Sequence, residues 1–220
     1  MSTRNSDDVP KHICLDLDGT LVDQIDGYYS SMVDTFKKYN LECPPKKLWH
    51  DALWNDDFSI MHPYGDDIDM WFEITDLYCL RHENISVFNH AKTFLDRAHS
   101  KNIKLTVATG RTISKNALKE LLAYHQIENY FDEFMSYGEM DHTKVVQAKD
   151  VNKKAMFDYL LNKTNTDYEN SWYVTDIAED AHRALDFGFA KVFGTTTGGI
   201  NPELFSAEIT VITSLDEVNI

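Results

Sequence analysis

An apolar run that ends in two aspartates one residue apart places the strongest constraint on the fold of this chain. Residues 13–21 read Ile-Cys-Leu-Asp-Leu-Asp-Gly-Thr-Leu. A short apolar run bounded by a turn residue is typical of a strand covered on both faces, as in a parallel sheet. Side chains two apart on an extended strand point to the same side, so Asp16 and Asp18 are predicted to lie together. Ligand sites in such sheets form outside the carboxyl ends of the strands, which predicts a binding site here.

The two carboxylates need a positive charge close to them. Like charges held at this separation destabilise each other, and a hard divalent cation with oxygen ligands is the simplest compensation. The alternative for a bare pair of acids is a solvated turn. The apolar residues before the pair and the glycine and threonine after Asp18 make that alternative less favourable. The pair therefore predicts a divalent metal site.

Helical patterns alternate with short apolar strands from Lys92 to the end of the chain. Helices are expected at residues 91–100, 114–125, 153–162 and 178–187, and strands at residues 103–108, 133–136, 171–175, 189–193 and 209–212. Such alternation is typical of a parallel sheet with helices on both faces. We therefore predict an α/β core with a Rossmann-like, doubly wound parallel sheet.

A different segment lies between the first strand and this alternation. Its apolar and aromatic residues recur at helical spacing over residues 28–39, 48–54 and 68–80. We predict a small helical cap domain at 24–87, inserted into a core domain made of 1–23 and 88–220. The many acids of the segment indicate a solvated face. Alternatively, they act with aromatic side chains to receive a cationic part of a ligand, the candidates being Trp49, Trp54, Trp71, Tyr28 and Tyr29.

Composition and charge exclude several classes of partner. The chain has 220 residues, 43% of them hydrophobic, which suits one core domain with a modest insertion. A formal net charge of -15 argues against nucleic acid or an anionic membrane as partner, because no basic stripe is present to neutralise phosphates. No signal-peptide pattern or membrane-spanning run is found, so a cytoplasmic location is expected. Three widely spaced cysteines indicate reduced thiols.

Four motifs in fixed order resemble those of the haloacid dehalogenase superfamily, most of whose members are magnesium-dependent phosphatases. The first motif is Asp-Leu-Asp-Gly-Thr-Leu-Val-Asp at 16–23, and the second is the segment at 103–111, an apolar strand followed by Thr109 at the family's phosphate-binding position. The fourth is the segment at 172–180, in which an apolar strand is followed by Asp176 and, four residues later, Asp180. Thr175 stands where glycine is most common in the family. The resemblance is to phosphatases with a helical cap between the first and second motifs, similar to phosphoglycolate phosphatases.

The third motif of that superfamily is a lysine near a helix start, and this chain offers several lysines. We favour Lys153, because Asn152 is a suitable N-cap and apolar residues follow at helical spacing. Lys149 is the alternative, Lys144 and Lys154 are the other lysines on offer, and any one of them could be a surface lysine instead.

The resemblance implies a role for each acid. Asp16 would attack phosphorus and form an aspartyl phosphate, and Asp18 would act as general acid and then as general base. Mg²⁺ would be held by Asp16, Asp176 and, through its backbone carbonyl, Asp18. Asp180 would orient a water molecule bound to the metal.

The resemblance also implies a phosphate site. Thr109, the Gly110 amide and Lys153 would complement the charge of the transferred group. The expected substrate is a small phosphorylated metabolite, and the oligomeric state is left open. A phosphomutase or phosphotransferase of the same superfamily is one alternative, although Thr20 resembles the phosphatase form of the first motif. A catalytically silent binding protein with this fold is the other alternative.

Overall fold

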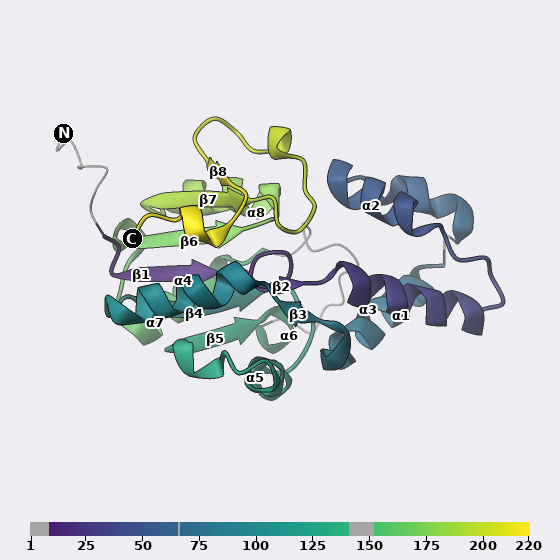
Figure 1. The fold of residues 1–220 in the computed structure, drawn as a ribbon, viewed down its shortest axis with the longest axis horizontal. Helices are drawn as coiled ribbons and strands as arrows, with labels where there is room; N and C mark the ends of the chain where they lie inside the picture. The colour runs from purple at the N-terminus through teal and green to yellow at the C-terminus, as the bar shows by residue number, and fades with distance from the viewer. Residues whose placement is uncertain (1–8, 66, 141–151) are drawn as a thin grey trace.

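A six-stranded parallel sheet forms the centre of the molecule (Figure 1). The computed structural model describes residues 9–65, 67–140 and 152–220. Neighbouring strands follow the order β5-β4-β1-β6-β7-β8, and each adjacent pair is parallel. The strands are β1 (His12–Leu15), β4 (Lys104–Thr109), β5 (Glu133–Ser136), β6 (Ser171–Thr175), β7 (Lys191–Thr195) and β8 (Thr210–Ile212). This topology confirms the predicted doubly wound α/β sheet.

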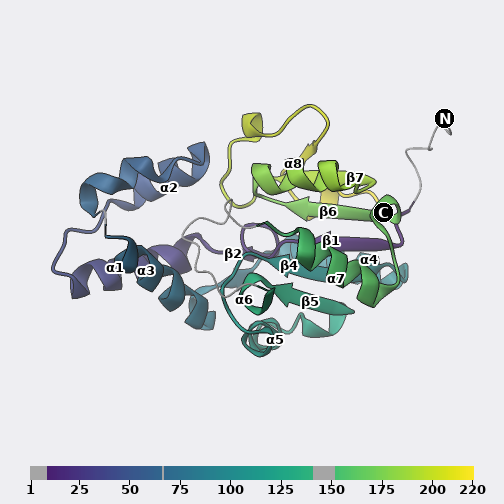
Figure 2. The ribbon, with the colours of Figure 1, turned by 180° about the vertical axis from the view of Figure 1, so that it is seen from behind.

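Helices cover both faces of the sheet. In Figure 1, α4 (Asn89–Ser100) lies in front of the sheet, and α5 (Lys115–Tyr124) packs against β5. Figure 2 shows α7 (Lys154–Thr164) and α8 (Ala178–Phe187) on the opposite face. A four-residue helix, α6 (Tyr137–Met140), follows β5. The remaining turns are 3-10 helices: η1 (Phe58–Tyr64), η2 (His82–Asn84), η3 (Glu128–Tyr130), η5 (Tyr168–Asn170), η6 (Pro202–Leu204) and η7 (Leu215–Glu217).

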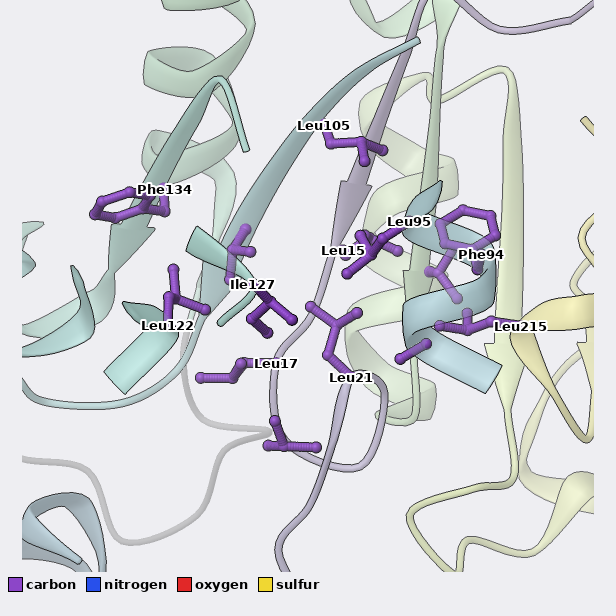
Figure 3. Packing of buried hydrophobic residues seen from close by; sticks show 14 of the residues in the cluster. Leu15, Leu17, Leu21, Phe94, Leu95, Leu105, Leu122, Ile127, Phe134 and Leu215 are labelled. Carbon is purple, nitrogen blue, oxygen red and sulfur yellow. The ribbon is translucent and has the colours of Figure 1, made fainter. Parts of the chain in front are cut away.

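The central strand β1 is apolar from Ile13 to Leu15 because it contacts a hydrophobic cluster on each face. Ile13 and Leu15 pack into one cluster, and Cys14 between them packs into the other. This is the side-chain alternation of an extended strand. Figure 3 shows Leu15 of the first cluster together with Phe94 and Leu95, which α4 contributes. The apolar run at the start of the sequence is therefore a strand buried on both faces, as predicted.

Three further helices lie beyond the carboxyl ends of the strands, at the far end of the molecule from the carboxyl terminus (Figures 1 and 2). They are α1 (Ile25–Lys38), α2 (Lys46–Asn55) and α3 (Ile68–Leu80), and we call residues 24–87 the helical segment. It has a hydrophobic cluster of its own, formed by Met32, Phe36, Trp49, Ala52, Leu53, Met61, Met70 and Ile74. The division of the chain into a core domain (1–23 and 88–220) and a cap (24–87) stays a prediction.

A short antiparallel ladder connects the entry and exit of the helical segment. It pairs β2 (Val22–Asp23) with β3 (Ser86–Val87). Two-residue strands have no readable periodicity, which is why the sequence did not predict them. No helix in the described ranges is long and apolar enough to cross a membrane. The three cysteines are free thiols, and Cys14 and Cys79 are buried.

His12 is expected to make stability depend on pH. Its ring nitrogens lie 2.9 Å from Ser171 Oγ and 2.8 Å from Thr106 Oγ1, bridging β1 to both neighbouring strands. Burial, with a smaller effect of Lys104, lowers the pKa of His12 from 6.5 to about 3. Between these values the unfolded chain binds a proton that the folded chain does not, so stability falls as pH falls.

The non-titrating variant His12→Gln isolates this contribution. Between pH 7 and pH 5, the wild type should lose about 2 kcal/mol more unfolding free energy than the variant. Urea denaturation of both proteins at the two pH values measures this difference. Equal losses in the two proteins would show that His12 does not titrate in this way.

Candidate active site

Asp16 is the first residue after β1 and lies at the carboxyl edge of the sheet. Its side chain is buried and accepts hydrogen bonds at both carboxylate oxygens. Oδ1 accepts from the backbone amide of Leu17 at 2.8 Å. Oδ2 accepts from Thr175 Oγ1 at 2.9 Å and from Lys153 Nζ at 2.6 Å. Residues from three separate stretches of the chain thus hold one carboxylate in place.

Lys153 lies directly before α7 and is buried between two acids. Its ammonium group is 2.6 Å from Asp16 Oδ2 and 2.9 Å from Asp180 Oδ2, and it donates to the Tyr173 hydroxyl at 3.2 Å. Burial alone would lower the pKa of Lys153, but the two aspartates raise it well above its ordinary value. The lysine is therefore held charged.

The structure brings Lys153, the favoured lysine, to the acids. Asn152 caps the helix from one residue earlier, as its Oδ1 accepts from the Lys154 amide at 3.0 Å. The alternative Lys149, like Lys144, lies outside the described residues.

Asp176 follows β6 and is held between two glycines. A Cβ atom added at Gly19 would lie 1.8 Å from Asp176 Oδ2, and one added at Gly198 would lie 2.0 Å from the same oxygen. The side chain is buried, and Oδ1 has no hydrogen-bond partner among the described residues. Burial raises the pKa of Asp176 well above its ordinary value, and the charge of Asp16 adds to this.

These donors fit a hard cation. A buried carboxylate with an unpartnered oxygen, close enough to Asp16 for their charges to repel, is stabilised by a dication, which reverses the effect of burial on its pKa. In the ranges that the structure describes, no three side chains of histidine, cysteine, aspartate or glutamate are grouped as metal ligands. A cation here would therefore be held by two carboxylates together with backbone oxygens or water, as hard cations accept.

Asp180, in the first turn of α8, is buried and pairs with Lys153. Burial raises the pKa of Asp180 to about 6, although the neighbouring ammonium group opposes this rise. Its contact with Lys153 connects it to Asp16 through a shared counter-charge. The ion pair supports the conformation of the lysine directly.

The Asp18 carboxylate is engaged by Arg111 and Tyr78. Arg111 donates from Nε to Oδ2 at 2.8 Å and from Nη2 to Oδ1 at 2.6 Å, and the Tyr78 hydroxyl donates to Oδ1. The guanidinium also lies 4.4 Å from the centre of the Tyr78 ring. Arg111 follows β4 and Tyr78 belongs to α3, so the helical segment contacts Asp18 directly.

Thr109 and Gly110 lie at the end of β4, beside these acids. Thr109 is buried, and its Oγ1 accepts from the Arg111 amide at 3.3 Å. One cavity of about 200 Å³ is lined by five of the predicted site residues: Asp16, Asp18, Thr109, Gly110 and Asp176. The other two, Lys153 and Asp180, form an ion pair and do not line it. The predicted acids and the predicted phosphate-binding residues of the second motif therefore meet at one place.

The helical segment forms the other side of the cavity. Its lining residues there include Tyr28, Trp49, Phe58, Met61, Trp71 and Tyr78. A second contact joins the segment to the core, because the Asn201 amide donates to the Trp54 carbonyl at 3.1 Å. The cavity thus lies between the carboxyl edge of the sheet and the helical segment.

Sequence reasoning missed several residues of this site. Thr175 donates to Asp16, and its Oγ1 also accepts from the Ile177 amide at 3.1 Å. A polar residue at the end of a buried strand was the available signal. Tyr173 and Tyr78 carried no signal, because aromatic residues at such positions are usually part of the core.

The glycine-rich loop at 194–199 is a further part of the site that the sequence did not predict. Gly198 packs against Asp176, and the Thr197 hydroxyl donates to the Gly19 carbonyl. The loop follows β7 at the same edge of the sheet, where ligand sites of parallel sheets form. It therefore shapes the site even though it is not a nucleotide-binding loop.

Comparison with known proteins gives one family. A family model described as haloacid dehalogenase-like hydrolase matches residues 13–193. No curated protein sequence matches the chain.

Solved structures share the fold at low sequence identity. A predicted phosphatase from Clostridium acetobutylicum is 17% identical, with a TM-score of 0.71 over 96% of this chain and 97% of that chain. A predicted phosphoglycolate phosphatase from Haemophilus somnus 129pt is 18% identical, with a TM-score of 0.70 over 94% and 96%. CbbY from Rhodobacter sphaeroides, in complex with xylulose-(1,5)bisphosphate, is 16% identical, with a TM-score of 0.68 over 96% and 97%. These likenesses show a common fold.

Proposed function

Because this chain belongs to the haloacid dehalogenase-like hydrolase family, we propose that it is a magnesium-dependent phosphatase acting on a small phosphorylated metabolite. The reaction would pass through an aspartyl phosphate on Asp16. The observation that carries the proposal is that Asp16, fixed by Lys153 and Thr175, lies near a buried Asp176 whose Oδ1 has no hydrogen-bond partner in the described part of the chain. Structures of the same fold described as predicted phosphatases give further support.

The residues around Asp16 suit a nucleophile. Thr175 and the Leu17 amide restrict the carboxylate to one orientation, and an oriented nucleophile is what an in-line displacement at phosphorus requires. Lys153, held charged, offsets the negative charge of Asp16 and Asp180. A magnesium ion held by Asp16, Asp176 and the Asp18 backbone carbonyl would supply positive charge for the phosphoryl oxygens.

Asp18 is the proposed general acid and base. Both of its oxygens are engaged by Arg111 and Tyr78, so one of these contacts has to loosen before Asp18 can give a proton to a leaving oxygen. Arg111 Nη1 is buried and has no partner among the described residues. A substrate phosphate near Thr109 and Gly110 offers acceptors to this guanidinium, which would draw it from Asp18. We propose residues 24–87 as the cap that carries Tyr78 toward and away from Asp18.

Hydrolysis of p-nitrophenyl phosphate tests the proposed function. The purified protein should release nitrophenol and inorganic phosphate with added Mg²⁺ and lose this activity in EDTA. The activity should return when Mg²⁺ is restored. Turnover that is the same with and without EDTA would contradict a metal-dependent mechanism, and no turnover with Mg²⁺ present would contradict a phosphatase.

The substitution Gly19→Ala is expected to weaken Mg²⁺ binding selectively. Its Cβ would meet Asp176 Oδ2 at 1.8 Å and would force that carboxylate to move. Loss of an oriented ligand typically costs about 10–100-fold in metal affinity. The Mg²⁺ concentration that gives half-maximal activity should rise by about that factor.

Gly199→Ala is the matched control for this effect. Gly19 and Gly199 both have positive φ, +69° and +82°, so both substitutions strain the backbone. The nearest atom to a Cβ at Gly199 is Ile25 Cδ1 at 3.6 Å, and no carboxylate is displaced. An equal rise in the Mg²⁺ requirement of both variants would show that strain, not Asp176, is responsible.

A further inference from the structure

We propose that Tyr78 is a positioning residue through which the helical segment controls proton transfer by Asp18, whereas Asp16 is positioned by the rest of the chain. The inference rests on the proposed phosphatase function, because it concerns the general acid of that reaction. It predicts that the helical segment matters for substrates with a strongly basic leaving oxygen. Substrates whose leaving group departs without a proton should depend on it much less.

The described hydrogen-bond partners of the Asp16 side chain all lie outside the helical segment. They are the Leu17 amide, Thr175 Oγ1 and Lys153 Nζ. Leu17 directly follows Asp16, Thr175 ends β6, and Lys153 directly precedes α7. Because these partners belong to the sheet and to a helix that covers it, the orientation of the attacking carboxylate does not depend on the position of the helical segment.

The Asp18 side chain, in contrast, is held from both sides of the cavity. The Tyr78 hydroxyl, from α3, donates to Asp18 Oδ1, and Arg111, which follows β4, donates to both carboxylate oxygens. Arg111 Nη2 also donates to the Tyr78 hydroxyl at 2.5 Å, so each of the three side chains is hydrogen-bonded to the other two. All three residues line the cavity. The carboxylate therefore keeps this orientation only while α3 lies over the edge of the sheet.

The two partners of Asp18 differ in what competes for them. The Arg111 guanidinium is charged and comes two residues after Thr109 of the proposed phosphate site, so a substrate phosphate attracts it. Tyr78 is uncharged, and its buried ring packs against the Tyr28 ring of α1, with 5.3 Å between the ring centres. When Arg111 turns to the phosphate, Tyr78 stays on Oδ1, and Oδ2 becomes the free oxygen of Asp18.

The freed oxygen carries the proton in both halves of the reaction. Asp18 Oδ2 gives a proton to the leaving oxygen while the bond from that oxygen to phosphorus breaks and Asp16 forms its bond to phosphorus. In the second half a water molecule attacks phosphorus, its proton passes to Oδ2, and the bond between phosphorus and Asp16 breaks. Tyr78 does not touch the reacting atoms. It holds Oδ1 so that Oδ2 is directed at them.

Two esters of similar shape and different leaving groups test the proposal. The phenolate that leaves p-nitrophenyl phosphate is weakly basic and needs no proton, whereas the alkoxide that leaves p-nitrobenzyl phosphate is strongly basic and needs one. The quantity compared is kcat/KM, because it covers the steps up to release of the alcohol and excludes hydrolysis of the aspartyl phosphate. In Tyr78→Phe, kcat/KM should fall at least about tenfold for the nitrobenzyl ester and less than about threefold for the nitrophenyl ester.

Several outcomes of this comparison overturn the inference. Equal falls for the two esters in Tyr78→Phe indicate a structural role of the hydroxyl, and an unchanged kcat/KM for the nitrobenzyl ester indicates no role. Turnover of the nitrophenyl ester alone by the wild type shows that Asp18 gives no proton to the leaving group, which overturns the inference and leaves the phosphatase function standing. Turnover of neither ester by the wild type contradicts the phosphatase function itself.

Two further variants serve as matched controls. Tyr28→Phe removes a second tyrosine hydroxyl from the cavity wall, one that lies 3.2 Å from Thr75 Oγ1 within the helical segment. Thr175→Val removes a donor to Asp16. Each variant should change kcat/KM of the two esters by the same factor, in Thr175→Val because attack by Asp16 is common to both reactions. A selective loss for the nitrobenzyl ester in either control overturns the inference.

A measurement of stability needs no turnover and separates this inference from the proposed function. Urea denaturation gives the free energies of unfolding of Tyr78→Phe, Asp18→Asn and the double variant. These two substitutions should be non-additive, because the hydroxyl and the carboxylate share a hydrogen bond, and Tyr28→Phe with Asp18→Asn should show a smaller coupling. Additive effects of the Tyr78 and Asp18 substitutions overturn the inference, whatever the activity. Non-additive effects without turnover of either ester support the contact and contradict the phosphatase.

Discussion

Asp16→Asn is expected to abolish phosphatase activity, with a loss of at least about 10⁴-fold in kcat. Asparagine is close in size, and its carbonyl can still accept from the Leu17 amide, but an amide does not attack phosphorus. The substitution also removes one carboxylate from the proposed metal site. Steady-state hydrolysis of p-nitrophenyl phosphate with saturating Mg²⁺ measures the loss, and circular dichroism checks that the variant is folded.

Asp158→Asn serves as the surface control. Asp158 lies on α7, where its carboxylate is 51% exposed and pairs with Lys154. The control should keep wild-type kcat. Retention of activity by Asp16→Asn would overturn the assignment of the nucleophile, and equal losses in the two variants would indicate a general effect of charge.

Lys153→Met is expected to show the largest loss of stability. The ammonium group lies 2.6 Å from Asp16 and 2.9 Å from Asp180, and all three side chains are buried. Its removal takes the nearest counter-charge from two buried carboxylates, since the Arg183 guanidinium is 3.9 Å from Asp180, and breaking a buried pair typically costs about 3–5 kcal/mol. Urea denaturation in EDTA measures this cost without compensation by a metal ion. Activity should fall as well, because Asp16 loses a partner that orients it.

The neighbouring lysine gives a matched control for this prediction. Lys154 is 49% exposed and pairs with Asp158 one turn along α7, so Lys154→Met should change the free energy of unfolding by less than about 1 kcal/mol. In the double variant with Asp180→Asn, the loss caused by Lys153→Met should become smaller, because one of the stranded charges is gone. A loss in Lys153→Met no greater than that in Lys154→Met would contradict the buried charge network.

The order of the motifs predicted which residues would meet, because parallel strands end at one edge of their sheet. Asp16 follows β1, Thr109 ends β4 and Asp176 follows β6, and these three strands are neighbours. Periodicity was enough to place each strand, since long apolar runs and amphipathic helices are strong local patterns. The choice of Lys153 among several lysines rested on helix capping, and the structure places this lysine on Asp16.

Such reasoning cannot predict contacts between segments that are far apart in the sequence. Tyr78 has the helical spacing of a core residue, and only the folding of α3 over the sheet brings its hydroxyl to Asp18. Arg111 is 93 residues from Asp18 in the sequence, and the structure shows an ion pair between them. The contact of Gly198 could not be predicted either, because nothing in its neighbours indicates Asp176, which is 22 residues earlier in the sequence.

The amino-acid sequence by itself determined the strands, the helices and the edge at which the acids gather, because these follow from local patterns and from the geometry of parallel sheets. The tertiary structure alone decided the partners of those acids and which residues of the helical segment line the cavity beside them. Hydrogen bonds, burial and ring stacking between residues far apart depend on how elements pack, and no local pattern carries that information. The proposed chemistry therefore follows from the motifs, whereas the contacts that hold Asp16, Asp18 and Lys153 in place follow only from the packed structure.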